Sequence, residues 1–336
     1  MVGINWLVIH MDKLVIIAGP TAIGKSAVAV ETAALIGGEI ISADSVQVYQ
    51  GMDIGTAKVR PEEMYASNGE YIPHHLLSIL PPDGKFSVAD FKNRVEKLIP
   101  QIAAKGKIPM LVGGTGLYIE AVIDPYKFTP MAADEKLRQQ LREEAEEKGK
   151  EHLHHKLDRI DPVSAQKIHP NDVKRVIRAL EVYYQTGVPI SAAGKRAPGR
   201  KGGKYRLCYL GMEAGREYLY DRINRRVDEM IKDGLIEETK ALLEKGYDPE
   251  LPSLQSLGYR HVINYLQGNW SLTDTIEWLK RDTRRFAKRQ LTWFKRDERV
   301  KWYDIQAFSD KTLMATEFAG VISRSIGDNV ELGNNE

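Results

Sequence analysis

The 336-residue chain has 43% hydrophobic and 28% charged residues and a net charge of only +2, the balance of an ordinary globular protein of one large or two modest domains. This excludes a chain that is basic throughout, so any contact with nucleic acid must come from selected basic segments. The single cysteine, Cys208, excludes an intrachain disulfide and a cysteine-rich zinc site. No apolar run reaches the roughly 18 residues of a membrane span, and we expect a cytoplasmic protein without membrane contact.

Residues 1–10 are mildly apolar but lack the basic start and the small-residue cleavage site of a signal peptide. A second methionine, Met11, stands just before the first predicted strand. An extra β-strand and an upstream extension both fit this segment, and the sequence leaves the choice open.

The first strong motif is a glycine-rich loop between a strand and a helix. An apolar run at 14–18 predicts the strand, residues 27–35 have helical spacing, and the residues between them read G-x-x-x-x-G-K-[ST]. Glycines let several backbone N–H groups face one anion, Lys25 adds a charge, and Ser26 offers a hydroxyl suited to Mg²⁺. The motif predicts a phosphate or diphosphate site formed by Gly19, Pro20, Thr21, Ala22, Ile23, Gly24, Lys25 and Ser26.

A carboxylate, Asp44, follows the second predicted strand at residues 39–43. Because the carboxyl ends of parallel strands share one edge of a sheet, we expect Asp44 to lie beside the phosphate loop. It could help to hold Mg²⁺, act as a general base, or serve only as the N-cap of a helix that follows. The three roles stay open, and the position at a strand end favours the functional ones.

A third strand end carries no acid. Helical spacing at 88–105 and an apolar run at 108–112 lead to Gly113-Gly114-Thr115-Gly116, in which Thr115 offers a hydroxyl. A phosphate-loop ATPase often has an acidic residue at such a strand end to support Mg²⁺ and water. The motif therefore favours a transferase that excludes water over a hydrolase.

A fourth apolar run, 207–212, completes the alternation of strands and helices that predicts a parallel sheet with helices on both faces. The expected fold is α/β, with a phosphate-loop NTPase-like sheet flanked by helices and an inserted helical domain. Helical spacing from 130 to 188 and a Gly/Lys/Arg-rich loop at 194–204 mark the insertion. We predict a first part of the core at 1–128, the insertion at 129–204, and the rest of the core with basic C-terminal helices at 205–336.

The predicted insertion contains a short basic and apolar run. Arg175 and Arg178 are three residues apart and share one helix face, between apolar positions that pack. Contact with phosphates and a solvent-exposed face without a partner fit the run equally well. The candidate residues are Lys174, Arg175, Val176, Ile177 and Arg178.

Helical spacing continues to the end of the chain, at 218–233, 235–245, 273–295 and 311–326, and residues 328–336 are expected to fray. Arg222 and Arg225 lie on the first of these helices, and arginine is the preferred residue for bidentate recognition of phosphate. From Lys280 to Lys301 there are ten Lys/Arg against three Asp/Glu, which predicts a basic surface.

Several stretches, taken in order, resemble the family of bacterial tRNA dimethylallyltransferases, also called tRNA isopentenyltransferases. The phosphate loop alone is shared by many nucleotide enzymes, whereas its combination with Asp-Ser-x-Gln-x-Tyr is far more specific. The matching stretches cover nearly the whole chain at 19–26, 42–49, 51–58, 113–118, 169–172, 178–181, 257–260 and 288–294.

The resemblance implies a reaction. A dimethylallyl group would move from its diphosphate to N6 of the adenosine just 3′ of the anticodon in tRNA, with Mg²⁺ assisting. The phosphate loop would hold the diphosphate, and Ser26 the metal. Asp44 would take a proton from the N6 amine, Thr115 would lie near the transfer site, and Arg222 would bind the diphosphate.

The resemblance also implies the tRNA contacts of a monomeric enzyme. Lys174 to Arg178 would grip the anticodon stem-loop, and the basic 280–301 segment would meet tRNA phosphates. Gln47 could pair with an adenine edge. The residues around the target base would be Asp44, Ser45, Val46, Gln47 and Thr115.

Three alternatives belong to other functional classes. Prenyl transfer to a free adenine nucleotide would not need the insertion with its basic loop. A phosphate-loop small-molecule kinase would turn over ATP. A non-catalytic RNA-binding protein that senses a nucleotide through the loop would not need Asp44.

Overall fold

The computed structural model describes residues 12–125, 134–193 and 204–327. Two expectations, an added strand at 1–10 and a frayed tail at 328–336, lie outside these residues, as does most of the basic loop at 194–204. The chain divides into two compact units, one of residues 1–123 and 202–336 and one of residues 124–201. Within the part of the chain that is described, no helix is long and apolar enough to cross a membrane.

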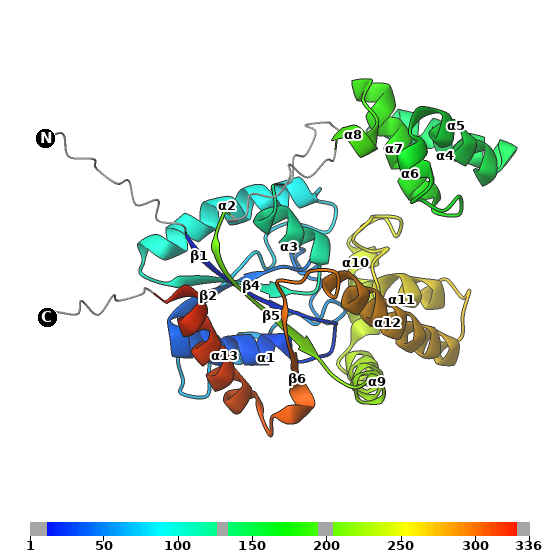
Figure 1. Ribbon diagram of the computed structural model, residues 1–336. Helices are drawn as coiled ribbons and strands as arrows, with labels where there is room; N and C mark the ends of the chain where they lie inside the picture. Colours follow the sequence, from blue (N-terminus) through cyan, green and yellow to red (C-terminus); the bar gives the residue numbers. More distant parts are fainter. Residues whose placement is uncertain (1–11, 126–133, 194–203, 328–336) are drawn as a thin grey trace, which may run out of the picture. The chain divides into compact units, whose positions relative to one another are not determined.

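The first unit is built on a six-stranded sheet in the order β3-β2-β4-β1-β5-β6, in which all neighbours are parallel (Figure 1). This confirms the predicted parallel sheet and the four predicted strands, to which the structure adds two short edge strands. The strands are β1 (Lys13–Ala18), β2 (Gly38–Ser42), β3 (His74–His75), β4 (Ile108–Gly113), β5 (Arg206–Glu213) and β6 (Lys301–Asp304).

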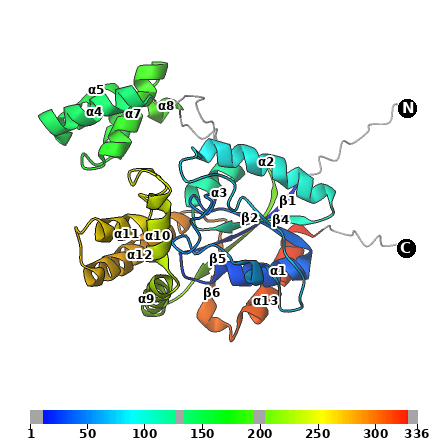
Figure 2. The same cartoon turned by 180° about the vertical axis from the view of Figure 1, so that it is seen from behind.

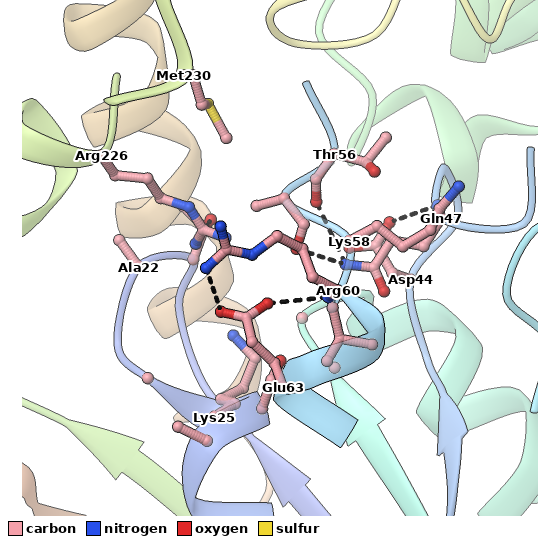
Figure 3. Close-up of a pocket in the computed structure, with 18 of the residues that line it drawn as sticks. Ala22, Lys25, Asp44, Gln47, Thr56, Lys58, Arg60, Glu63, Arg226 and Met230 are labelled. Atoms are coloured by element: carbon pink, nitrogen blue, oxygen red, sulfur yellow. Dashed lines mark hydrogen bonds and ion pairs between the residues drawn. The ribbon is translucent and has the colours of Figure 1, made fainter. Parts of the chain in front are cut away.

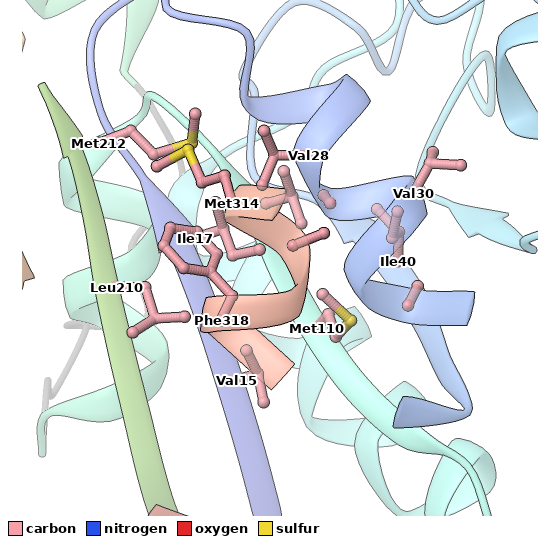
Figure 4. Close-up of a cluster of buried hydrophobic side chains, with 14 of the residues drawn as sticks. Val15, Ile17, Val28, Val30, Ile40, Met110, Leu210, Met212, Met314 and Phe318 are labelled. Carbon is pink, nitrogen blue, oxygen red and sulfur yellow. The ribbon is translucent and has the colours of Figure 1, made fainter. Parts of the chain in front are cut away.

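Helices cover both faces of this sheet. Figures 1 and 2 show α1 (Lys25–Ile36) and α13 (Lys311–Ile326) on one face, and α2 (Val88–Ala104) and α3 (Gly116–Ile123) on the other. The central strands are therefore buried on both sides, as their unbroken apolar runs require. In Figure 4, Phe318 and Met314 of α13 pack against Ile17 and Leu210 of the sheet.

Four further helices of the first unit hold the chain that follows β2. They enclose a separate apolar cluster in which Val48 and Met52 meet Leu235 and Tyr259. The segment between β2 and β3 is thereby fixed beside the sheet edge. The helices are α9 (Arg216–Lys232), α10 (Leu235–Glu244), α11 (Tyr259–Leu266) and α12 (Leu272–Phe294), and the short 3-10 helices η1 (Pro61–Met64) and η2 (Ile305–Ala307) also belong to this unit.

The second unit is helical. The sequence predicts helical spacing from 130 to 188, and the structure divides the described part of it at Gly149, where φ is 89°, and again at Asp161. Pro162 begins the next short helix and cannot continue the previous one. The helices are α4 (Glu135–Lys148), α5 (Lys150–Ile160), α6 (Pro162–Ala165), α7 (Val173–Thr186) and α8 (Ile190–Ala193).

Candidate active site

The phosphate loop joins β1 to α1, the context that its motif requires. Gly19 and Gly24 have φ values of 152° and 97°, which favour glycine, and a Cβ at Gly19 would lie 2.5 Å from the carbonyl oxygen of Met212. Lys25 lies at the start of α1 and donates from Nζ to the carbonyl oxygen of Pro20 at 2.7 Å. Ser26 is exposed on the first turn of the same helix.

Lys25 is in surroundings that disfavour its charged form. Desolvation and the nearby guanidinium of Arg226 lower its pKa to about 7, although the carboxylate of Asp44 acts in the opposite direction. An anion bound at the loop would restore the favourable environment for a protonated lysine.

Two arginines of α9 contact the loop. Arg222, a predicted site residue, donates from Nε to the carbonyl oxygen of Ala22 at 2.8 Å. Arg226, which the sequence reasoning missed, lies 3.5 Å from the hydroxyl of Thr21, and burial together with Arg222 lowers its pKa. Its i, i+4 spacing from Arg222 places both on one helix face and could have identified it. Arg225 is exposed on α9 and also lines the cavity.

Asp44 stands where β2 ends, and its Oδ1 accepts the backbone N–H groups of Val46 at 2.9 Å and Gln47 at 3.3 Å. No helix begins here, since the next helical element is η1, so the expected helix N-cap is wrong. The carboxylate instead caps a turn, and this role occupies only one of its oxygens. Asp44 lines the same cavity as Lys25 and Ser26. A carboxylate in this position can still accept a proton from a bound amine.

The Gly-Gly-Thr turn after β4 abuts the Asp44 turn. Thr115 donates from its backbone N–H to the carbonyl oxygen of Ala43 at 3.2 Å, and its Oγ1 accepts the N–H of Ser45 at 3.3 Å. A Cβ at Gly113 would lie 2.2 Å from the same Ala43 oxygen. The structure therefore brings Asp44 and Thr115 together, as the strand-end argument predicts.

Gln47 is held firmly by the protein. Its Nε2 donates to the carbonyl oxygens of Thr56 at 3.2 Å and Ala57 at 3.4 Å. Gln47 and Thr56 are labelled in Figure 3. The Oε1 atom of Gln47 accepts the hydroxyl of Ser42 at 2.9 Å. These contacts fix which end of the amide is the donor. Pairing of Gln47 with an adenine edge stays a prediction, and it would have to compete with these contacts.

The loop that holds Gln47 is itself fixed by Glu238 at the start of α10. This carboxylate accepts the backbone N–H groups of Asp53 and Ile54, each at 2.9 Å, and that of Gly55 at 3.2 Å. The ring of Tyr259 packs so closely that a Cβ at Gly55 would lie 2.5 Å from it. Sequence reasoning gave Glu238 no role, because a glutamate in a first helical turn is common on any surface helix.

These elements enclose a cavity of about 820 Å³ in the first unit. Figure 3 shows Lys25, Asp44 and Arg226 directed toward it from the phosphate loop, the end of β2 and α9. A cavity of this size, lined by several cations and several carboxylates, suits a phosphorylated substrate together with a second reactant. Its charged lining includes Lys25, Asp44, Asp53, Lys58, Arg60, Glu62, Glu63, Arg222, Arg225 and Arg226.

Only part of the candidate RNA-binding run, residues 174–178 of the second unit, is exposed and free to contact RNA. The side chains of Val176 and Ile177 are 1% and 5% exposed and belong to the apolar core of that unit. Arg178 donates to Oε2 of the buried Glu181 at 2.7 Å. Lys174 and Arg175 are exposed, so any tRNA contact by this run is expected from them.

A parallel sheet with a phosphate loop after its first strand, and with a carboxylate and a threonine at neighbouring strand ends, defines the chain as a phosphate-loop protein. The chain belongs to the IPP transferase family, whose model matches residues 47–297. This confirms the resemblance found in the sequence.

Individual relatives agree. The tRNA dimethylallyltransferase of Carboxydothermus hydrogenoformans is 55% identical over 293 residues, which cover 87% of this chain and 92% of that protein. The solved tRNA isopentenylpyrophosphate transferase of Bacillus halodurans is 45% identical, with a TM-score of 0.67, and the match covers 94% of this chain and 98% of that one. A eukaryotic dimethylallyltransferase solved while acting on tRNA is 29% identical, with a TM-score of 0.74 and coverage of 91% and 78%.

Proposed function

We propose that the protein transfers a dimethylallyl group from dimethylallyl diphosphate to N6 of the adenosine just 3′ of the anticodon in tRNA. The observation that carries this proposal is the shared cavity of the phosphate loop and Asp44 in a chain of this family. The relatives named above, one of which was solved while acting on tRNA, support the same substrate.

The transfer follows from the arrangement. The lone pair of N6 forms a bond to C1 of the dimethylallyl group, the bond from C1 to the diphosphate oxygen breaks, and its electrons leave with the diphosphate. N6 then carries an excess proton, which passes to the carboxylate of Asp44. The products are N6-dimethylallyladenosine in tRNA and free diphosphate.

The leaving diphosphate has a ready set of partners. The N–H groups at the start of α1, Lys25 and Arg222 converge on the loop, and Arg226 adds a further charge at Thr21. Because the negative charge on the diphosphate grows as the bond breaks, these groups stabilise the transition state more than the bound substrate.

The donor set also fits Mg²⁺. Ser26 lines the cavity, and its hydroxyl together with diphosphate oxygens would offer the hard oxygen ligands that Mg²⁺ prefers. Ser26 would hold the ion, which when bound would offset charge on the diphosphate.

The RNA would be held by exposed cations. Lys174 and Arg175 would meet the anticodon stem-loop, and the basic residues of α12 would contact phosphates. Ser45, Val46 and Gln47, in the turn after Asp44, would surround a base that has left the stack. We expect the enzyme to act as a monomer in the cytoplasm.

The names of the relatives do not favour a nucleotide prenyltransferase or a kinase. The deciding experiment supplies radiolabelled dimethylallyl diphosphate to unmodified tRNA, with AMP and ATP as parallel acceptors. Label on tRNA alone is expected. Label on a free nucleotide would replace the proposal with prenylation of adenine nucleotides, and ATP turnover without label would replace it with kinase activity.

A further inference from the structure

Gln290 of α12 forms a bridge between two loops of the site. Its Oε1 accepts the backbone N–H of Thr21 in the phosphate loop at 2.8 Å, and its Nε2 donates to the carbonyl oxygen of Gly114 at 3.0 Å. The side chain is only 7% exposed. Buried polar groups are kept when their bonds are made, and here both ends of one amide are used between segments far apart in the chain.

The loop after β4 is shaped to receive this helix. A Cβ at Gly114 would lie 2.2 Å from Nε2 of Gln290, and a Cβ at Gly116 would lie 2.2 Å from Cδ1 of Trp293. Gln290 and Trp293 are three residues apart and share one face of α12. Two glycines therefore let a helix face approach closely, which accounts for both motifs, Gly-Gly-Thr-Gly and Lys-Arg-Gln-Leu-Thr-Trp-Phe.

The same loop carries the acceptor side of the site. Thr115 is hydrogen bonded to Ala43 and Ser45, the neighbours of Asp44. Gln290 thus connects the loop that would hold the diphosphate with the turns that would hold the amine and its base. A shift of one loop against the other would change the distance between the reacting atoms.

We infer that Gln290 is a positioning residue, which sets the spacing between the phosphate loop and the Asp44 and Thr115 turns for the transfer. The inference rests on the proposed function. A carboxamide is needed because it accepts and donates at once. Glutamate would lose the donor when it is ionised, and methionine would fill a similar volume without either bond.

The test compares Gln290→Glu and Gln290→Met with the parent protein, and with Gln101→Glu and Gln101→Met as matched changes at an exposed position of α2. The kcat and KM of transfer, the Kd of inorganic diphosphate and the melting temperature are measured for each. The Gln290 variants should lose kcat by at least about tenfold, because small misplacements of reacting groups are costly. The affinity of Gln290→Met for diphosphate should stay within about threefold, because the remaining N–H groups, Lys25 and the arginines are intact. Gln290→Glu is compared in kcat alone, since an ionised carboxylate beside Thr21 would repel the diphosphate.

A kcat within about twofold of the parent would overturn the inference, since even a modest misplacement should cost more. In Gln290→Met, a loss of diphosphate affinity equal to the loss of kcat would also overturn it, because the glutamine would then only shape the phosphate loop. If neither variant folds, Gly114→Ala tests the same contact from the other side: reduced kcat with retained diphosphate binding supports the inference, and unchanged kcat overturns it. A parent protein that does not label tRNA would refute the proposed function, whereas an active parent with equally active variants would refute the positioning role alone.

Discussion

The hydroxyl of Tyr259 donates a 2.6 Å hydrogen bond to Oε1 of Glu238, and the same carboxylate accepts three backbone N–H groups at 53–55. Burial and the neighbouring carboxylate raise the pKa of Tyr259, so the phenol remains a donor. The next two carbonyl groups of this loop, those of Thr56 and Ala57, accept hydrogen bonds from Gln47. The contact between Tyr259 of α11 and Glu238 therefore supports the turn that carries Asp44 and Gln47.

The Tyr259→Phe variant should therefore lower the free energy of unfolding by about 1.5–3 kcal/mol, the range for a hydrogen bond to a charged group. It should also lower the transfer rate, because the loop around Gln47 loses support. Urea denaturation measures the first effect. Tyr71→Phe is the control, since the Tyr71 side chain is 51% exposed. An equal loss of unfolding free energy in both variants would mean that the hydrogen bond from Tyr259 to Glu238 does not stabilise the fold.

The two roles of Asp44 can be separated by substitution. Asparagine keeps an oxygen for the N–H groups of Val46 and Gln47 but removes the base. Asp44→Asn should reduce the transfer rate by about 10²–10⁴ while the melting temperature and tRNA affinity are kept. Asp44→Ala removes the cap as well and should also lower the melting temperature. A near-parental rate for the asparagine variant would leave only the capping role.

The central strands and long helices could be predicted because continuous apolar runs indicate buried strands and regularly spaced apolar residues indicate helices. Residues 14–18 are all fully buried, and α13 lies at the predicted 311–326. The edge strands could not be predicted: β3 has two residues, and β6 is only partly buried. The eight-residue helices α3 and α11 are too short for a clear period. They are held in place by neighbouring helices, α3 by α2 and α12, and α11 by α10 and α12.

The residues of the candidate site also fall into those that the sequence could predict and those that it could not. The phosphate loop, Asp44 and Thr115 are local motifs at strand ends, and one rule about parallel sheets brings them together. Glu238 and Gln290 act through contacts that span about half or more of the chain, so no spacing within the sequence marks them. Val176 and Ile177 show a different limit. Their helical spacing predicted that they pack, and the structure buries them, whereas the family resemblance alone assigned them to the tRNA contact.

The lowered pKa of Lys25 predicts that diphosphate binding takes up a proton. With a pKa of about 7, most Lys25 side chains in the free protein are neutral at pH 8, and a bound anion favours the charged form. Affinity for diphosphate should accordingly fall as the pH rises above about 7. Lys25→Arg, which is charged throughout this range, should take up fewer protons and show a flatter pH profile.

Calorimetry in two buffers with different ionisation enthalpies measures this uptake with inorganic diphosphate as the ligand. The ionisation of diphosphate itself is common to the parent and the variant, so their difference reports on residue 25. Equal proton uptake by the two proteins would contradict the prediction.

Arg175 and Arg178 lie on the same helix, but we expect Arg178 to contribute to stability and Arg175 to contribute to RNA binding. Arg178 and Arg138 both donate to Glu181, which is 0% exposed. Desolvation alone would raise the pKa of Glu181, but the two guanidinium groups and the backbone N–H of Asp134 together outweigh it and lower that pKa below its ordinary value of 4.5. The stabilisation is therefore present above pH 4.5 and is lost as the pH falls through the lowered pKa. Arg178→Ala should cost about 1–3 kcal/mol of stability and move acid unfolding to higher pH.

Arg175 should instead affect RNA binding alone. Its side chain is 69% exposed and lies 3.4 Å from the partly exposed Asp172, an ion pair that contributes little to stability. If it meets a tRNA phosphate, Arg175→Ala should leave the melting temperature unchanged, weaken tRNA binding, and reduce the slope of log K against log salt by about 1. Filter binding between about 50 and 200 mM salt measures this slope for the parent, Arg175→Ala and Arg178→Ala. An unchanged slope for Arg175→Ala would exclude the phosphate contact, whereas a reduced slope for a stable Arg178→Ala would mean that Arg178 exchanges Glu181 for the RNA.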